Sequence, residues 1–279
     1  MMSFIVAHSH GDTTGVDPAD LLGTGLIIAA AALYLWAAAR PSRSGRRWPA
    51  ARGAAYLSGL VLLALALFTD VGGDHDDLTV HIGRHLVLMM IVAPLLVGGG
   101  PLRLLLRSLP RRRRMILVEV MQDPAVRAVT AGRWAGLLLT VDYYGSMAVY
   151  LHTAWLPASE EHLWLHVATH VYFVLCGVLF WSALLGQDPT GWRPGYRTKL
   201  TMTLVGVPAN VLLGWSLLWR APALAGHGAA ELIAAAWAVA VGGSVLSVGG
   251  AAVVVVRRRR ADKRRFEQAV REEPWHVAS

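Results

Sequence analysis

The sequence has few charged residues and almost no cysteine. Asp, Glu, Lys and Arg make up 16% of its 279 residues, whereas apolar residues make up 55%. A typical soluble domain carries about 25% charged residues, so a soluble globular protein is excluded. Cys176 is the one cysteine, which excludes an internal disulfide framework and a CxxC metal clip.

The chain also lacks the motifs of common enzyme and receptor classes. No P-loop, glycine-rich nucleotide fingerprint or nucleophile–base set occurs in a fitting context, so we predict that the protein is not an enzyme. The glycines at 98–100 end an apolar run and are interpreted as a turn. The last apolar run contains no lysine for a Schiff base, which excludes a retinal-type seven-helix receptor.

Long apolar runs, separated by clumps of charge, dominate the sequence instead. A run of about 20 apolar residues matches the roughly 30 Å hydrocarbon thickness of a bilayer, where a helix satisfies its own backbone hydrogen bonds. We therefore predict an all-α, polytopic membrane helical bundle. Its seven predicted transmembrane helices are residues 21–39, 53–69, 79–99, 134–152, 162–186, 199–219 and 231–256.

The basic residues indicate the orientation of this bundle, because Lys and Arg favour the cytoplasmic side of short loops. The loops 40–52, 100–133 and 187–199 hold five, eight and three basic residues. The tail after residue 256 holds eight more, so 24 of the 26 fall on one side. We therefore predict that the N-terminus lies outside and the C-terminus in the cytoplasm.

Three regions follow from this topology. They are a short external N-terminal segment at 1–20, a seven-helix transmembrane domain at 21–256 and a basic cytoplasmic tail at 257–279. The tail is expected to continue the last helix. Its charge, and the net charge of +8, then face anionic lipid of the inner leaflet, so nucleic-acid binding is not predicted. The expected location is the bacterial plasma membrane, as a multi-pass protein.

The histidines are divided as unevenly as the basic residues. Those on the predicted outer side or in the outer leaflet are His8, His10, His75, His81, His85, His152, His162, His166, His170 and His227. Only His276 falls on the cytoplasmic side. An outer-side function for these imidazoles is therefore expected.

Two groups of these residues recur every four positions, which places each group on one stripe of a helix. The stripe on the third span consists of His81, His85 and Met89. The stripe on the fifth span consists of His162, His166 and His170. His152 ends the fourth span near the same level. Stripes on separate helices can meet across a bundle.

Imidazole and thioether ligands suit copper, and the thioether favours Cu(I), whereas zinc accepts the imidazoles alone. Ionisable groups inside a membrane are costly unless they are paired or functional. We predict a Cu(I) site formed by His81, His85, His166, His170, His162, His152 and Met89. Met90 and Met147 are alternative soft ligands. The alternative for any one histidine is that it snorkels to headgroups or hydrogen-bonds to another helix.

Two further polar residues lie inside predicted spans. Asp142 in the fourth span pairs with Arg84, orients a histidine, or forms a hydrogen bond to a neighbouring helix. Cys176 in the fifth span packs in the core or contacts copper transiently. The sequence leaves these alternatives open.

Two segments carry a combination of these features. HIGRHLVLMMIVAPLLVGGGP, residues 81–101, has two histidines four apart, a Leu/Met run, Ala-Pro and a Gly-Pro exit. YLHTAWLPASEEHLWLHVATHVYFVLCGVLFWSALLG, starting at Tyr150, has a helix-end His, a Pro-containing outer loop, a histidine-bearing helix and Gly177-x-x-x-Trp181. The pattern resembles the CtaG family, the caa3-type cytochrome c oxidase assembly factors.

This resemblance implies a membrane copper-binding assembly factor. Such a protein helps to deliver copper to the catalytic subunit of a haem–copper cytochrome c oxidase, which would be its partner. A soluble copper donor on the outer side would be a second partner.

From the residues alone, two other functions stay open. A haem-binding membrane electron-transfer protein would use paired histidines from different helices as axial ligands, usually deep in the bundle. A metal-ion transporter would place ionisable groups through the whole membrane, whereas the inner half here has none beyond Asp142 near the middle.

Overall fold

The computed structural model describes residues 18–40, 47–69, 77–125, 134–185, 194–219 and 228–272. Within these ranges the regular structure is helical and contains no strand, so the predicted all-α class is confirmed. The histidines that lie outside the described residues are His8, His10, His75, His227 and His276. Most of the predicted N-terminal segment lies outside them too.

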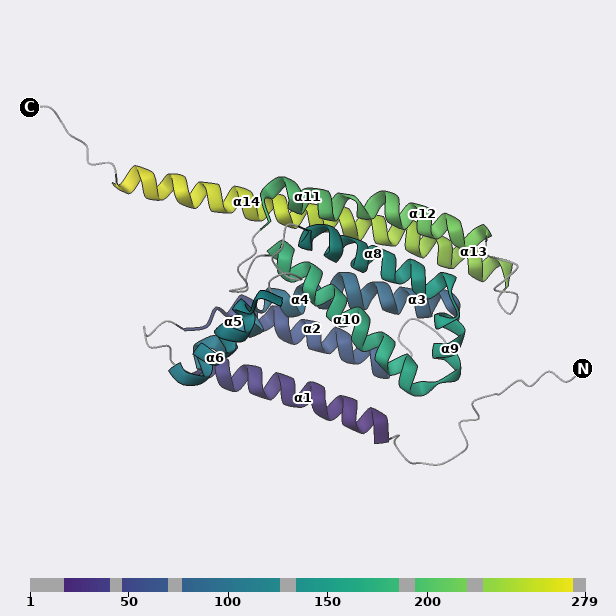
Figure 1. The fold of residues 1–279 in the computed structure, drawn as a ribbon, viewed down its shortest axis with the longest axis horizontal. Coiled ribbons are helices and arrows are strands. Elements are labelled where there is room, and N and C mark those ends of the chain that lie inside the picture. The colour runs from purple at the N-terminus through teal and green to yellow at the C-terminus, as the bar shows by residue number, and fades with distance from the viewer. Residues whose placement is uncertain are drawn as a thin grey trace, which may run out of the picture.

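The long helices lie side by side with their axes roughly aligned, whereas short helices such as α9 run across them (Figure 1). In chain order they are α1 (Pro18–Ala39), α2 (Ala50–Phe68), α3 (Leu78–Val87), the π-helix η1 (Leu88–Val92), α4 (Ala93–Gly98), α5 (Pro101–Ser108), α6 (Arg111–Gln122), α8 (Ala135–His152), α9 (Trp155–Glu161), α10 (Leu163–Leu185), α11 (Tyr196–Leu204), α12 (Gly206–Trp219), α13 (Ala229–Trp237), the π-helix η2 (Ala238–Gly243) and α14 (Ser244–Glu272). The segments α3–η1–α4 and α13–η2–α14 each form one continuous rod.

By length and composition, six helical segments can cross a membrane. They are Leu21–Ala39, Ala50–Phe68, Leu78–Ser108, Leu163–Leu185, Tyr196–Trp219 and Ala229–Arg271. Each overlaps a predicted span, although Leu78–Ser108 and Ala229–Arg271 extend past the predicted ends at 99 and 256. The remaining predicted span, 134–152, is the helix α8, but Asp142, its tyrosines and His152 dilute its apolar content, and it is not among the six.

The outer surface of the bundle is strongly apolar. Leu212 and Trp219 on α12, for example, expose 61% and 73% of their surface. Soluble monomers rarely expose large contiguous apolar patches, whereas lipid-facing helices do so along their length. The chain is a multi-pass membrane protein.

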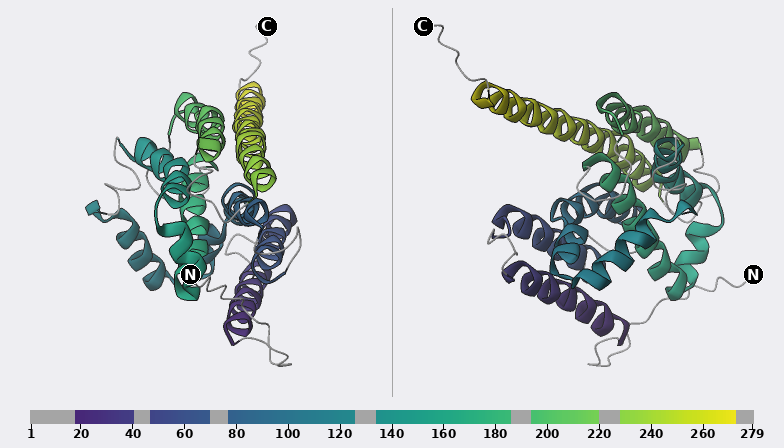
Figure 2. Two further views of the ribbon diagram at one scale, coloured as in Figure 1. Left: turned by 90° about the vertical axis from the view of Figure 1, so that its right-hand side faces the viewer. Right: turned by 60° about the vertical axis from the view of Figure 1, so that its left-hand side comes forward.

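The rod α3–η1–α4 occupies the centre of the bundle. It contacts α2, α10, α13 and η2, and 56% of its most apolar stretch is buried. α1 lies at one edge against α2 and α5, while α12, α13 and α14 form the opposite side (Figure 1). α14 extends well beyond the other helices (Figure 2), so the expected continuation of the last helix into the basic tail is confirmed as far as Glu272.

A proline explains the π-helix at the middle of the central rod. In the i→i+5 pattern of η1 the carbonyl of Met89 would accept from the backbone nitrogen of Pro94, which carries no hydrogen. That carbonyl instead accepts from Tyr143 Oη on α8 and Trp181 Nε1 on α10, each at 3.1 Å. A single freed carbonyl thus joins three helices.

The same crossing depends on a glycine one turn before the tryptophan. A Cβ at Gly177 would lie 2.7 Å from Ala93 Cβ and 3.0 Å from Met89 O, so only glycine allows α10 this close to the central rod. The Gly177-x-x-x-Trp181 spacing therefore places the small residue and the indole donor over one carbonyl. This contact holds α10 against α3–η1–α4 and sets the position of the α10 histidines.

The predicted turn at 98–100 is also present. Gly100 has a φ of 66°, a conformation that glycine adopts without steric cost. Pro101 then begins α5, where its missing N–H is harmless. The chain thereby leaves the central rod and runs along the end of the bundle as α5 and α6 (Figure 1).

Candidate metal centre

The N-terminus of α3 is fixed by two carboxylates. The Asp77 side chain accepts from the backbone N–H of Thr79 at 2.7 Å, as an N-cap residue does. Glu231, from the first turn of α13, accepts from the backbone N–H of Leu78. Because the start of α3 is held in this way, His81 lies in its first turns and His85 lies one turn deeper.

The start of α10 is defined by His162. This residue has an extended backbone where α9 ends, and its carbonyl accepts from the backbone N–H of His166 at 3.0 Å. His166 therefore lies in the first turn of α10 and His170 lies one turn deeper. Since α3 and α10 both begin at this end of the bundle, their histidines descend in the same direction.

The two stripes meet as two tiers of rings. In the outer tier the ring centroids of His81 and His166 are 5.7 Å apart, and in the inner tier those of His85 and His170 are 5.0 Å apart. Within each helix the rings are equally close, at 4.7 Å on α3 and 4.4 Å on α10. The tiers are separated by about 6 Å along the helices, given a rise of 1.5 Å per residue.

On α3 the deeper ring is the more buried one. His81 is partly exposed near the end of the bundle and His85 is only 1% exposed, whereas His166 and His170 on α10 are both partly exposed. Phe173 and Tyr150 close around His85, with centroids at 4.8 and 5.1 Å. An ion would therefore reach the outer tier first.

Hydrogen bonds around Tyr150 assign the proton positions. Ser159 Oγ donates to the Leu156 carbonyl at 2.7 Å, so it accepts from Tyr150 Oη at 3.0 Å. The Tyr150 oxygen must then accept from His81 Nε2 at 2.7 Å. The single hydrogen of His81 Nε2 is then directed at Tyr150, and a hydrogen on His85 Nε2, 3.0 Å away, would face it, so His85 Nε2 is the unprotonated nitrogen and can only share that hydrogen. His85 therefore directs a lone pair into the cluster, since the partner of one ring nitrogen fixes the tautomer.

The other ring nitrogen of His85 is not satisfied. Its Nδ1 is buried without a hydrogen-bond partner in the described part of the chain, which costs about 1–3 kcal/mol. As the rings stand, no three His, Cys, Asp or Glu side chains of the described residues are arranged to hold a metal ion.

Two other predicted ligands lie apart from these four. His152 is half-buried at the end of α8, and its Nδ1 bonds to the Ala148 carbonyl at 3.0 Å. The His162 side chain is exposed. Among the ring contacts of the described residues, none joins His152 or His162 to the cluster.

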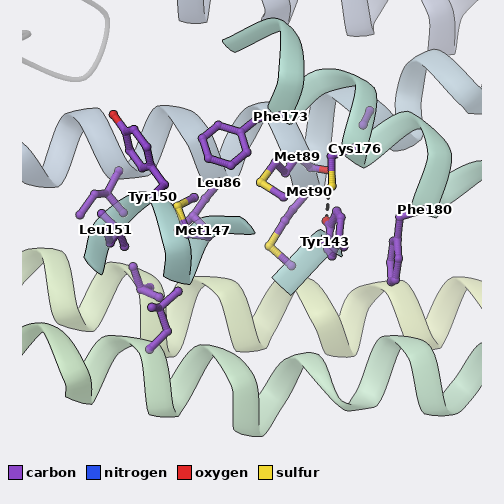
Figure 3. Close-up of a cluster of buried hydrophobic side chains, with 14 of the residues drawn as sticks. Leu86, Met89, Met90, Tyr143, Met147, Tyr150, Leu151, Phe173, Cys176 and Phe180 are labelled. Atoms are coloured by element: carbon purple, nitrogen blue, oxygen red, sulfur yellow. Dashed lines mark hydrogen bonds between the residues drawn. The ribbon is translucent and has the colours of Figure 1, made fainter. Parts of the chain in front are cut away.

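Met89 lies one turn below His85, beside a small cavity of about 20 Å³. The cavity is lined by Leu86, Met89, Met90, Tyr143, Tyr144, Met147, Ala209, Asn210 and Leu213. All three candidate soft ligands of the sequence analysis are thus neighbours in this core (Figure 3). A space of this size holds about one water molecule, and therefore also one small cation.

Asp142 and Cys176 bond to each other below the cluster. Asp142 Oδ1 accepts from Tyr172 Oη at 2.7 Å, and its Oδ2 accepts from Cys176 Sγ at 3.1 Å. The predicted alternative of a hydrogen bond between helices is thus confirmed for Asp142, while Arg84 donates to the Thr69 carbonyl. Cys176 is 4% exposed and belongs to the packed core.

Sequence reasoning missed the hydrogen bonds from His81 through Tyr150 to Ser159 and the role of Trp181 as a hydrogen-bond donor. Tyr150 lies two residues before His152, and Ser159 lies in the outer loop segment, so neither shares a helical stripe with the cluster. Trp181 entered the sequence analysis only as the last residue of the Gly177-x-x-x-Trp181 pattern. The carbonyl to which Trp181 donates is left free by Pro94 on another helix. A proline inside an apolar run predicts that neighbouring helices satisfy such a carbonyl, but it does not identify the side chains that do so.

Comparisons with known proteins agree with the pattern in the central helices. The sequence profile of the family described as cytochrome c oxidase caa3 assembly factor matches residues 32–261. An uncharacterized protein of Mycobacterium leprae is 27% identical over 203 residues, which are 68% of this chain and 30% of that protein. Uncharacterized proteins of Mycobacterium bovis and Mycobacterium tuberculosis are each 26% identical over 184 residues, 63% of this chain and 27% of theirs.

The match with this chain thus spans less than a third of the length of these relatives. No solved structure matches the chain.

Proposed function

This chain belongs to the family of cytochrome c oxidase caa3 assembly factors, and on that basis we propose that it binds copper in the membrane and delivers it to the catalytic subunit of a haem–copper oxidase. The observation that carries the proposal is the convergence of four imidazoles from α3 and α10, with centroids 4.4–5.7 Å apart. Copper is cargo in this scheme, and the protein itself catalyses no reaction.

The two tiers provide a stepwise route for the ion. Cu(I) from a soluble donor first meets His81 and His166, which are partly exposed. Rotation of the His81 ring breaks its bond to Tyr150, which keeps its donor bond to Ser159; the lost bond costs about 1 kcal/mol, and ligation of the ion must offset it. The ion then exchanges ligands with His85 and His170, about 6 Å deeper, without losing its whole coordination shell.

The methionine cavity extends this route with softer ligands. Met89, Met90 and Met147 line a space large enough for one desolvated cation. Thioethers favour Cu(I) over zinc, so we assign the cavity to the selection and transient holding of Cu(I). His152 and His162 remain proposed ligands at the entrance, where a donor would dock.

The proposed orientation places the histidine cluster at the outer surface of the bacterial plasma membrane. From His166 to Leu185, α10 rises about 28 Å, close to the hydrocarbon thickness of about 30 Å. α8 contacts α10 and α12 and lies alongside them (Figure 1), which supports it as the seventh span. Reporter fusions test this topology: a fluorescent protein at the C-terminus should mature in the cytoplasm, and an export-dependent phosphatase there should be inactive.

Copper binding is tested on the purified protein under reducing conditions, by competition with a chromogenic Cu(I) chelator. The double variant His85→Ala/His170→Ala should lose Cu(I) affinity by more than the roughly 10–100-fold expected when only an outer-shell partner of a metal is removed. The comparison variant is His152→Ala/His162→Ala, which removes the two proposed entrance ligands outside the ring cluster and should lower the affinity less than the first variant. Unchanged binding in the first variant would overturn the proposed site.

The same preparation separates the remaining functions. A visible absorption band in the spectrum of the purified protein would indicate bound haem. Copper flux into liposomes that contain the protein would indicate a transporter. For delivery to an oxidase, the expected result is co-purification of an oxidase subunit, together with a copper-poor oxidase in cells that carry only His85→Ala/His170→Ala. An oxidase with full copper content in those cells would refute delivery through this site.

A further inference from the structure

A basic cavity of about 490 Å³ lies at the opposite end of α10 from the histidine cluster. Its cationic lining residues come from three separate segments and are Arg52, Lys199, Arg257, Arg258, Arg260 and Arg264. No Asp or Glu of the described residues lines it. The floor is apolar and includes Leu184, Leu185 and Val254. The cavity thus combines a cationic rim with an apolar base.

Two of these cations also complete the end of α10. Lys199 Nζ donates to the Leu184 carbonyl and Arg257 Nη1 donates to the Leu185 carbonyl, both at 2.7 Å. They satisfy carbonyls that have no partner within the helix and offset the negative end of its dipole. An anion in the cavity is therefore not repelled by the end of α10.

The arginines of α14 face the cavity in a helical register. Arg257, Arg260 and Arg264 are spaced by three and four residues and share one face of the helix. Arg259 and Arg265 belong to the same basic stretch but do not line the cavity. Arg258, which lies beside that face and pairs with Asp262 at 2.8 Å, also lines the cavity. The site therefore uses part of the α14 surface and is not a general property of the basic tail.

We infer that this cavity binds the headgroup of an anionic phospholipid. Arginine forms paired, charge-assisted hydrogen bonds with phosphate, and the volume lies within the 300–1,000 Å³ of typical small-molecule sites. A lipid is favoured over free phosphate because the cavity lies at the end of α10, at the level where lipid headgroups begin; Leu184 and Val254 are buried and close its apolar base. With several cations around one space, a headgroup with two phosphates is preferred to one with a single phosphate.

The position of the cavity agrees with this ligand. It lies at the end of α10, about 28 Å along the helix from the outer histidine tier, where the opposite headgroup layer of a bilayer of roughly 30 Å hydrocarbon thickness begins. A lipid bound there would bridge the ends of α2, α10, α11 and α14. The inference rests on the membrane location of the chain and is independent of copper.

The test presents single lipids to the full-length protein in neutral-detergent micelles, so that attraction to a charged surface does not contribute. Native mass spectrometry and thermal unfolding are recorded with cardiolipin, phosphatidylglycerol, phosphatidylcholine or inorganic phosphate. The variant Arg260→Gln/Arg264→Gln alters the cavity. The matched control Arg259→Gln/Arg265→Gln removes the same charge from the same exposed helix, so both variants are expected to fold.

We expect cardiolipin to stay bound to the protein and to raise its unfolding temperature, and phosphatidylglycerol to do both more weakly. The affinity for cardiolipin should fall at least tenfold in the cavity variant and less than threefold in the control. Equal losses in both variants would overturn the site in favour of general attraction to the tail. Equal binding of phosphatidylcholine, or protection by inorganic phosphate alone, would overturn the assignment to an anionic lipid. Copper binding should be unchanged in both variants, so the two proposals fail separately.

Discussion

Replacement of Gly177 by alanine tests the crossing that positions the α10 histidines. The added Cβ would lie 2.7 Å from Ala93 Cβ and 3.0 Å from the Met89 carbonyl oxygen. Non-bonded carbons prefer about 3.5–4.0 Å, and both neighbours belong to or directly adjoin the backbone. α10 and the central rod must therefore separate by about 1 Å.

The expected cost follows from three terms. Overpacking of this kind destabilises by about 1–3 kcal/mol. The separation also weakens the 3.1 Å bond from Trp181 to the Met89 carbonyl, worth about 1 kcal/mol. Alanine regains about 0.5–1 kcal/mol because it is the better helix former. The net destabilisation of Gly177→Ala is therefore about 1–3 kcal/mol.

The assay is unfolding of the purified protein in a mixed-detergent titration, followed by tryptophan fluorescence. The control is Gly249→Ala on α14, where an added Cβ meets nothing within 4 Å, so the protein should be unchanged or slightly more stable. Cu(I) affinity should fall in Gly177→Ala alone, because His166 and His170 move with α10. If the two variants unfold at the same detergent fraction, the close crossing is absent and the reasoning is wrong.

Three further predictions concern the same core. Trp181→Phe and Tyr143→Phe should each lower the free energy of unfolding by about 1 kcal/mol. The double variant should lose more than the sum of the two, because the buried Met89 carbonyl then has neither of its two donors. Additive losses in the unfolding assay would contradict the shared acceptor. Cys176 should react with an aqueous maleimide only after denaturation, so rapid labelling of the folded protein would refute its burial. Cu(I) binding should weaken as the pH falls, since protons compete for imidazole nitrogens; a flat affinity profile would exclude imidazole ligands.

The helical class and most span positions could be predicted because hydropathy is a local property. Whether a stretch such as 163–185 crosses a bilayer depends on the transfer of its own side chains. α8 was the harder case, since Asp142 and several tyrosines lower its apolar content while it packs beside α10. The four-residue spacing of the histidines also identified their stripes, because a regular helix converts spacing into direction.

Only the tertiary structure decided which of these histidines meet. His81, His85, His166 and His170 come together because carboxylate caps, a proline-freed carbonyl and Gly177 fix the level and closeness of α3 and α10. His152 lies outside that contact, although its sequence position is equally suggestive.

The basic cavity illustrates the same division. The sequence alone predicts that positive charge gathers on one side of the membrane, since loop composition is read directly from the chain. That Arg52, Lys199 and Arg264 surround one space depends on helices far apart in sequence packing together. Their rotation and tilt are set by non-local contacts, which no window of sequence contains.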